Sequence, residues 1–187
     1  DTLVLMAGAD DAANSRTIAD AQKTAQDVNS YYGQNSYGGV LLTYTFLDAD
    51  GDSGHADGYS VGPSVAPYAD KEREFAIAAV KKAFEQGAPR EEVELARIIV
   101  VYSGPSKQAD EAKGNFSTLC CWPDNGKWFD IEVGPDEDKS HVFAGSIIMV
   151  AEQDGLGLWT HEVGHSLYSH NVLWTRHYKI CDRYNYD

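Results

Sequence analysis

The feature that most constrains the fold is the run Ala96-Arg-Ile-Ile-Val-Val-Tyr102, which is apolar at nearly every position. A strand with one solvated face alternates polar and apolar residues, whereas a strand that is covered on both faces does not. The run therefore predicts a buried strand in an α/β sheet with helices packed on it. With 187 residues, of which 43% are hydrophobic, the chain is large enough for one domain of this kind, spanning residues 1–187.

The other expected strands are also apolar, and several are rich in β-branched residues. They cover residues 2–6, 40–47, 127–133 and 145–151, and we expect the strand at 40–47 to be central in the sheet. Residues 48–67 and 103–125 lack such a pattern and are predicted as loops. Residues 91–95 are predicted to add a helical turn.

Two amphipathic helices are predicted between these strands. The first has Asn14 or Ser15 as its N-cap and ends at Gly33, and the second opens at Asp70 and ends at Gly87. Their apolar faces follow helical spacing: Ile18, Ala21, Ala25, Val28 and Tyr32 in the first, and Phe75, Ala76, Ala79, Val80, Ala83 and Phe84 in the second.

A motif with metal-ligand spacing lies near the C-terminus, at His161-Glu162-Val163-Gly164-His165. On a helix the two histidines are four positions apart, so both imidazoles leave the same face. Two neutral imidazoles suit a tetrahedral zinc site, and Glu162 is positioned to take a proton from a zinc-bound water. The motif predicts an active-site helix with His161 and His165 as zinc ligands and Glu162 as the general base.

The neighbours of the motif favour a buried helix over a surface helix with two incidental histidines. Trp159, Val163 and Leu167 give the helix an apolar surround. A glycine such as Gly164 costs a helix interior about 1 kcal/mol relative to alanine, so we expect another element to pack close to the backbone there.

Charge and hydropathy exclude several kinds of partner. The net charge of −14 disfavours nucleic acid and anionic membrane surfaces, and is compatible with cation binding and with an extracellular protein. No apolar run approaches the roughly 18 residues of a membrane helix, so membrane insertion is not expected. The three cysteines cannot all pair within one chain: a bridge from Cys120 or Cys121 to Cys181 and buried free thiols both stay open.

Three stretches follow one another in the order seen in a known family. Residues 28–42 (VNSYYGQNSYGGVLL), residues 98–105 (IIVVYSGP) and residues 147–165, which end in the motif, resemble the immune inhibitor A family of secreted zinc metallopeptidases. The resemblance implies a zincin-like mixed twisted sheet with packed helices and an HExxH active-site helix. It further implies that an edge strand holds an extended substrate antiparallel, and that the protein works outside the cell or at its surface.

The chain departs from that family after the second histidine. The family continues with Gly-Leu-Pro-Asp-x-Tyr-Asp, whereas here residues 166–181 intervene before Asp182-Arg-Tyr-Asn-Tyr-Asp187. On this resemblance Asp182 is the expected third zinc ligand, with His170 and His177 as rivals. Both methionines precede the motif, so we expect either a reduced C-terminal subdomain or a fragment of a longer secreted protein.

A second metal is suggested by Asp48-Ala-Asp-Gly-Asp52, whose alternating carboxylates are typical of calcium loops. Asp48, Asp50 and Asp52 are the candidate ligands. The loop is not an EF-hand, and an acidic solvated loop is the alternative interpretation.

The function that the sequence favours is a zinc-dependent endopeptidase that hydrolyses protein or peptide substrates. The alternative is a non-catalytic surface or interaction module that keeps a zincin fold and a structural metal. Glu162 favours the enzyme, because a purely structural site needs only the ligands.

Overall fold

The structure is a computed structural model that describes residues 1–49, 58–86, 93–121, 128–135, 139–172, 174–175 and 178–179; it leaves out the side chains of residues 93, 121 and 168 onward. In chain order the elements are β1 (Thr2–Gly8), α1 (Ile18–Asn35), β2 (Tyr44–Leu47), β3 (Tyr59–Ser60), the 3-10 helix η1 (Ala66–Tyr68), α2 (Glu72–Glu85), β4 (Val93–Leu95), β5 (Arg97–Tyr102), β6 (Leu119–Cys121), β7 (Phe129–Val133), β8 (Ser140–Ala144), β9 (Ile147–Ala151), α3 (Leu156–Val172), β10 (Trp174–Thr175) and β11 (Tyr178–Lys179).

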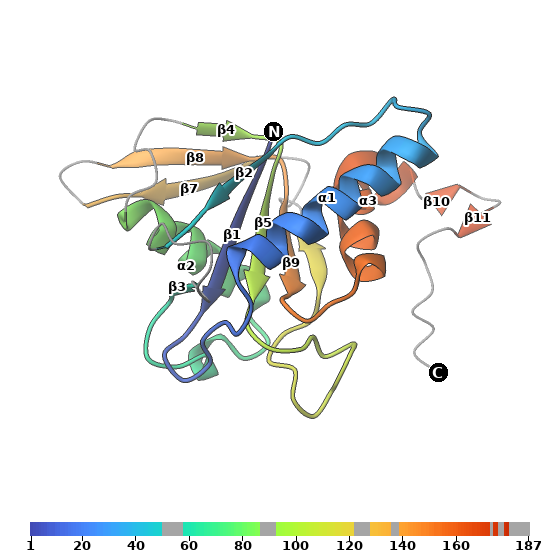
Figure 1. The fold of residues 1–187 in the computed structure, drawn as a ribbon. Helices are drawn as coiled ribbons and strands as arrows, with labels where there is room; N and C mark the ends of the chain where they lie inside the picture. Colours follow the sequence, from blue (N-terminus) through green and yellow to red (C-terminus); the bar gives the residue numbers. More distant parts are fainter. Residues whose placement is uncertain are drawn as a thin grey trace.

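The main sheet of the described chain has the strand order β2-β1-β5-β9-β6, with β3 also paired to β1 (Figure 1). Strands β2, β1, β5 and β9 are parallel, and β6 closes one edge antiparallel to β9. A smaller sheet, β4-β8-β7, contains the antiparallel hairpin of β7 and β8. The protein is therefore a mixed α/β fold with a mixed sheet and, in its described part, three α-helices.

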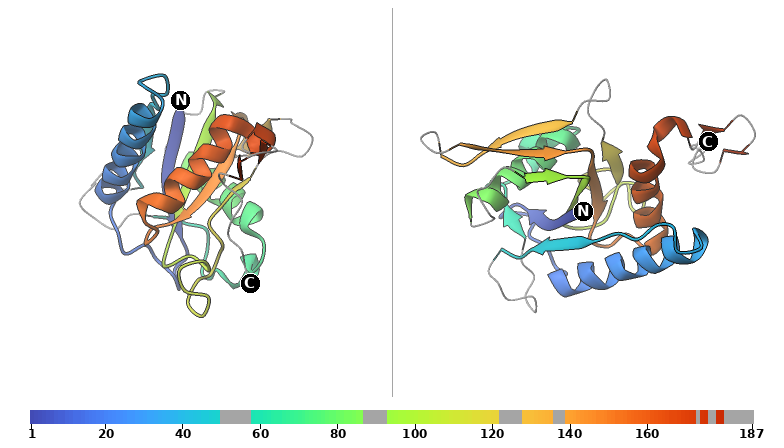
Figure 2. Two further views of the ribbon diagram at one scale, coloured as in Figure 1. Left: turned by 90° about the vertical axis from the view of Figure 1, so that its right-hand side faces the viewer. Right: turned by 90° about the horizontal axis from the view of Figure 1, so that it is seen from above.

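The main sheet is buried on both faces, as the run at residues 96–102 predicts. On one face α1 and α3 pack against alternate strand residues, such as Val4 and Ile99. On the other face α2 packs together with the smaller sheet against the intervening residues, such as Leu5 and Val100. Figure 2 shows α1 and α2 on opposite sides of the strands. None of the described helices is long and apolar enough to cross a membrane.

The helix faces are confirmed, but several helix ends are not where the sequence predicts. All the apolar residues expected on α1 and α2 are buried. The N-cap of α1 is Thr17 and not Asn14 or Ser15, because Thr17 and Asp20 form a reciprocal capping box. The helix also runs past Gly33 to Asn35. Helix α2 begins at Glu72, two residues after the predicted start, and Gly87 lies outside the described residues.

Several predictions that depend on strand pairing are wrong. The segment at 40–47 forms a strand only over Tyr44–Leu47, and that strand is at the edge of the sheet rather than its centre. The predicted helical turn at 91–95 is wrong for Val93–Leu95, which pair with β8 as strand β4. The predicted loop at 103–125 contains β6, and the loop at 48–67 contains β3. These short strands exist through pairing with distant residues, which local sequence does not report.

Candidate functional site

The site is organised around α3, where the two motif histidines lie one turn apart on the same face. Their Nε2 atoms are 3.0 Å apart, and their rings meet edge to face at 85°. Two nitrogens bound to one tetrahedral zinc at about 2.0–2.1 Å are themselves about 3.3 Å apart. The two rings are hydrogen-bonded to each other through these nitrogens, and the separation is also close to that of two ligands on one metal ion. Burial also lowers the pKa of His161, which favours the neutral imidazole that a metal needs.

Glu162 lies between the histidine pair and the edge strand β6. Its carboxylate is 3.9 Å from Nε2 of His161 and accepts a hydrogen bond from the backbone N–H of Cys120. The residue is only 5% exposed. Burial raises the pKa of the Glu162 carboxyl to about 7; the Cys120 hydrogen bond opposes the rise and the Asp154 carboxylate adds to it. A carboxyl with such a pKa is suited to exchanging protons near neutral pH.

A buried polar network joins β6 to the turn that precedes α3. The Asp154 carboxylate accepts hydrogen bonds from the Ser106 hydroxyl at 2.6 Å, from the Ala151 N–H at 2.9 Å and from the Thr118 hydroxyl. Thr118 immediately precedes β6, and its hydroxyl also meets the Tyr102 hydroxyl at 3.3 Å. The network fixes the edge strand relative to the start of the motif helix.

Helix α1 holds α3 through a tyrosine. The Tyr32 hydroxyl donates a hydrogen bond of 2.5 Å to the carbonyl oxygen of Thr160. A Cβ atom at Gly164 would lie 2.7 Å from that hydroxyl oxygen. The prediction that something packs close to the backbone at Gly164 is therefore confirmed, and the element is α1.

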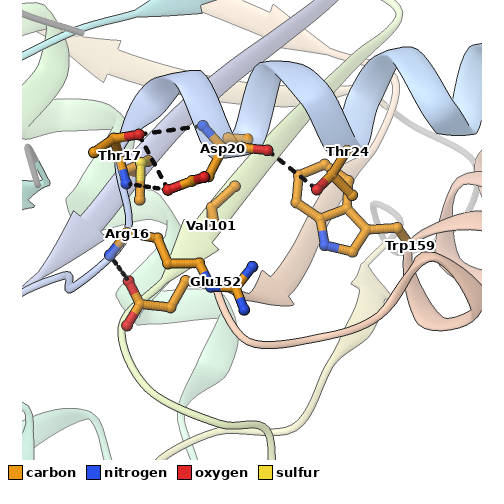
Figure 3. A pocket seen from close by; sticks show the side chains of 9 residues that line it. Arg16, Thr17, Asp20, Thr24, Val101, Glu152 and Trp159 are labelled. Carbon is orange, nitrogen blue, oxygen red and sulfur yellow. Dashed lines mark hydrogen bonds between the residues drawn. The ribbon is translucent and has the colours of Figure 1, made fainter. Parts of the chain in front are cut away.

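A second polar cluster lies at the carboxyl ends of β1, β5 and β9, beside a small hollow at the start of α1 (Figure 3). The Glu152 carboxylate accepts hydrogen bonds from the backbone N–H groups of Ser15 at 2.8 Å, Arg16 at 3.1 Å and Gly104 at 2.9 Å. The Ser15 hydroxyl and the Asn14 amide also donate to it. Asn14 and Ser15, the two residues predicted as N-caps of α1, therefore bind Glu152 instead.

The remaining predicted site residues are not brought together by the described structure. Asp182 and His177 lie outside the described residues, and the side chain of His170 is not described. Asp48 follows β2, but Asp50 and Asp52 are outside the described ranges. Within those ranges no group of three or more His, Cys, Asp or Glu side chains is arranged to hold a metal ion.

The roles of three residues were missed by sequence reasoning: Tyr32, Glu152 and Asp154. Tyr32 was predicted only as a buried position. Glu152 and Asp154 both follow the end of β9 at Ala151, and each is about 6% exposed. Acidic residues directly after an apolar strand are a signal that could have singled them out, since a buried carboxylate needs hydrogen-bond donors.

The fold and the site together define a mixed α/β protein with two histidines and a glutamate on a helix beside an antiparallel edge strand. No model of a known protein family matches the chain, and no curated protein sequence matches it. What the site does must therefore be argued from its own geometry and from the motif.

Proposed function

We propose that the protein is a zincin-like, zinc-dependent endopeptidase that cleaves extended polypeptides, with Glu162 as the general base. The observation that carries the proposal is the 3.0 Å separation of the two Nε2 atoms of His161 and His165, with the Glu162 carboxylate 3.9 Å from one of them. The four-residue spacing brings the two rings together, and the buried carboxyl beside them is what distinguishes this pair from incidental surface histidines.

The proposed chemistry divides between the metal and the chain. A zinc ion held by His161 and His165 would supply a Lewis acid that polarises the scissile carbonyl and makes the attacking water more acidic. Glu162 takes a proton from the attacking water and returns it to the amine that leaves. In the metal-free chain burial raises the pKa of Glu162 to about 7, and a zinc ion beside it would lower that pKa toward the charged form that a base needs.

The proposed substrate site is the edge strand β6. Among the described strands β6 pairs only with β9, and it is antiparallel to it. An extended peptide that added to such an edge would gain backbone hydrogen bonds without selecting particular side chains. The hydrogen bond from Cys120 N–H to Glu162 connects this strand directly with the proposed base.

A catalytic zinc site has three protein ligands, and the two histidines supply only two of them. Asp182 is the proposed third ligand. His170 and His177 are the rivals. Asp182→Ala should lower zinc affinity substantially, whereas His170→Ala and His177→Ala should leave it nearly unchanged. Zinc content after dialysis against graded chelator distinguishes the three, and loss of zinc in either histidine variant alone would overturn the assignment.

The decisive experiment measures cleavage of denatured casein by the zinc-loaded protein, with and without chelator. Glu162→Gln should keep close to one zinc per chain and lose activity by at least about 10²-fold, because the amide cannot accept the proton. Glu111→Gln, in an exposed loop, is the matched control and should cleave like the parent. Zinc binding without any cleavage by the parent would instead support the non-catalytic module, and zinc well below half-occupancy would refute both.

A further inference from the structure

An open hollow lies between the start of helix α2 and the first residue of the edge strand β6. Its volume is about 340 Å³, which is within the roughly 300–1,000 Å³ of ligand pockets. The residues that line it are Asp70, Lys71, Glu72, Arg73, Glu74 and Leu119. Leu119 belongs to β6, so the hollow adjoins the strand on which the substrate is proposed to lie.

The strand register defines which side chains of β6 point toward this hollow. Leu119 is in register with Met149 on β9, and Cys120 is in register with Ile148. Paired residues of antiparallel strands lie on the same face of a sheet. Met149 packs in the cluster that contains α2, and Ile148 packs in the cluster that contains α1 and α3. Leu119 therefore faces α2 and the hollow, whereas Cys120 faces the motif helix.

An extended peptide that added to β6 would follow the same alternation. A peptide residue paired with Leu119 would direct its side chain into the hollow. The neighbouring peptide residue, paired with Cys120, would lie on the side of Glu162, where the proposed chemistry takes place. The hollow is therefore positioned to receive a substrate side chain close to the scissile bond.

Most of the charged groups around the hollow already have a partner. Lys71 Nζ lies 3.8 Å from Glu74 Oε2, and Lys107 Nζ lies 2.9 Å from Asp70 Oδ1. The Arg73 guanidinium lies 5.1 Å from the centroid of an aromatic ring on β7. These contacts involve both cations and two of the three carboxylates that line the hollow.

Glu72 is the lining carboxylate that has no ion pair among the described residues. Its Oε1 accepts the backbone N–H of Ser117 at 3.4 Å, which is a long contact, and its Oε2 has no partner in the described part of the chain. Because Ser117 lies two residues before β6, this contact holds the carboxylate beside the start of the edge strand. The hollow thus combines an apolar side chain, Leu119, with one negative charge that lacks a counterion.

We propose that the hollow is a subsite for a basic side chain of the substrate, which lies along Leu119 and places its charge at Glu72. Lysine and arginine pack their aliphatic part on apolar surface while the charged end reaches a polar partner. The inference rests on the proposed function, because it takes β6 as the strand that pairs with the substrate. It adds a preference that backbone pairing alone does not supply: lysine or arginine at a fixed position near the cleaved bond.

Mapping the cleavage sites in denatured casein by mass spectrometry tests this preference. The parent should show lysine or arginine enriched at one fixed position near the scissile bond. Glu72→Gln keeps the shape and removes the charge, so it should reduce the enrichment by about fivefold. Glu85→Gln changes the net charge equally, at the other end of α2 and outside the hollow, and should cleave like the parent. No enrichment in the parent, or equal enrichment in Glu72→Gln, would overturn the proposal.

A binding measurement without cleavage separates this proposal from the proposed function. The Glu162→Gln protein is titrated, by fluorescence anisotropy, with two labelled alanine–serine peptides that are identical except for one central residue. That residue is lysine in one peptide and norleucine, which is similar in length but uncharged, in the other. The lysine peptide should bind about fivefold more tightly, and adding Glu72→Gln, but not Glu85→Gln, should remove the difference.

The two measurements fail in different ways. If the parent cleaves nothing while the lysine peptide still binds more tightly through Glu72, the proposed function is refuted and the subsite is supported. If the parent cleaves casein while the two peptides bind equally, the proposed function is retained and the subsite is refuted.

Discussion

The contact between Gly164 and Tyr32 allows a double-mutant cycle whose outcome follows from the geometry. Gly164→Ala would place a methyl group 2.7 Å from the Tyr32 hydroxyl oxygen, which is closer than side-chain carbons ordinarily approach. The hydroxyl cannot move away freely, because it is bonded to the Thr160 carbonyl at 2.5 Å. The substitution therefore sets a gain in helix propensity against overpacking between α1 and α3.

The magnitudes of the two effects predict a net loss. Alanine gains about 1 kcal/mol over glycine in a helix interior, and overpacking a rigid contact costs about 1–3 kcal/mol. Gly164→Ala should thus lower the free energy of unfolding by up to about 2 kcal/mol. Tyr32→Phe alone should cost about 1 kcal/mol through its lost hydrogen bond. In the double variant the clash is gone, so it should be about 1–3 kcal/mol more stable than the sum of the single changes.

Urea denaturation of the four proteins, with the metal state held constant by chelator, measures the cycle. Gly33→Ala is the matched control, because Gly33 lies inside α1 with no atom near its missing Cβ, and it should stabilise the protein by about 0.5–1 kcal/mol. A Gly164→Ala protein that gains stability like the control, with a coupling energy near zero, would refute the proposed packing.

Three further predictions concern carboxylates. Folding raises the pKa of Glu162 from 4.5 to about 7, so the buried charge destabilises the metal-free protein increasingly as pH rises through that window. The free energy of unfolding of Glu162→Gln, relative to that of the parent, should therefore rise by up to about 3 kcal/mol between pH 4 and pH 8. Urea titration measures this difference, and a difference that does not change with pH would contradict the prediction. Glu152→Ala should cost about 3 kcal/mol or more in the same assay, since it strands buried N–H donors, and a loss below about 1 kcal/mol would count against it. If Asp48, Asp50 and Asp52 bind calcium, millimolar calcium should raise the Tm of a chelator-stripped, zinc-restored sample, and an unchanged Tm would reject that site.

What the sequence predicted well are features set by local periodicity. The stripe from Ile18 to Tyr32 follows helical spacing and is buried throughout, and the apolar run at β5 lies inside the sheet, with a neighbouring strand on each side. The facing imidazoles of His161 and His165 likewise follow from their four-residue spacing. Each of these depends only on the geometry of a single element.

What the sequence did not predict depends on contacts between distant residues. Ser15 has the chemistry of an N-cap, but its N–H and hydroxyl bind Glu152, 137 residues away, and Thr17 caps the helix instead. Strand β6 has only three residues, and it exists because Cys120 is in register with Ile148 on β9. The position of Glu162 beside that strand follows from the same pairing. The sequence therefore predicted the helix that carries the site residues, but it did not predict the edge strand that lies beside them.

The position of Glu152 bears on which ligands this fold can accept. Helix α1 connects β1 to one neighbouring strand across one face, and α2 leads to β5, the other neighbour, across the opposite face. Such a position, where the connections from neighbouring strands go to opposite faces of the sheet, is a topological switch point. At switch points α/β proteins commonly hold the phosphate of a nucleotide on backbone N–H groups. Here the N–H groups of Ser15, Arg16 and Gly104 already hold the chain's own carboxylate. The chain thus places its own carboxylate where such proteins bind a phosphate, so these three N–H groups already have a negatively charged partner.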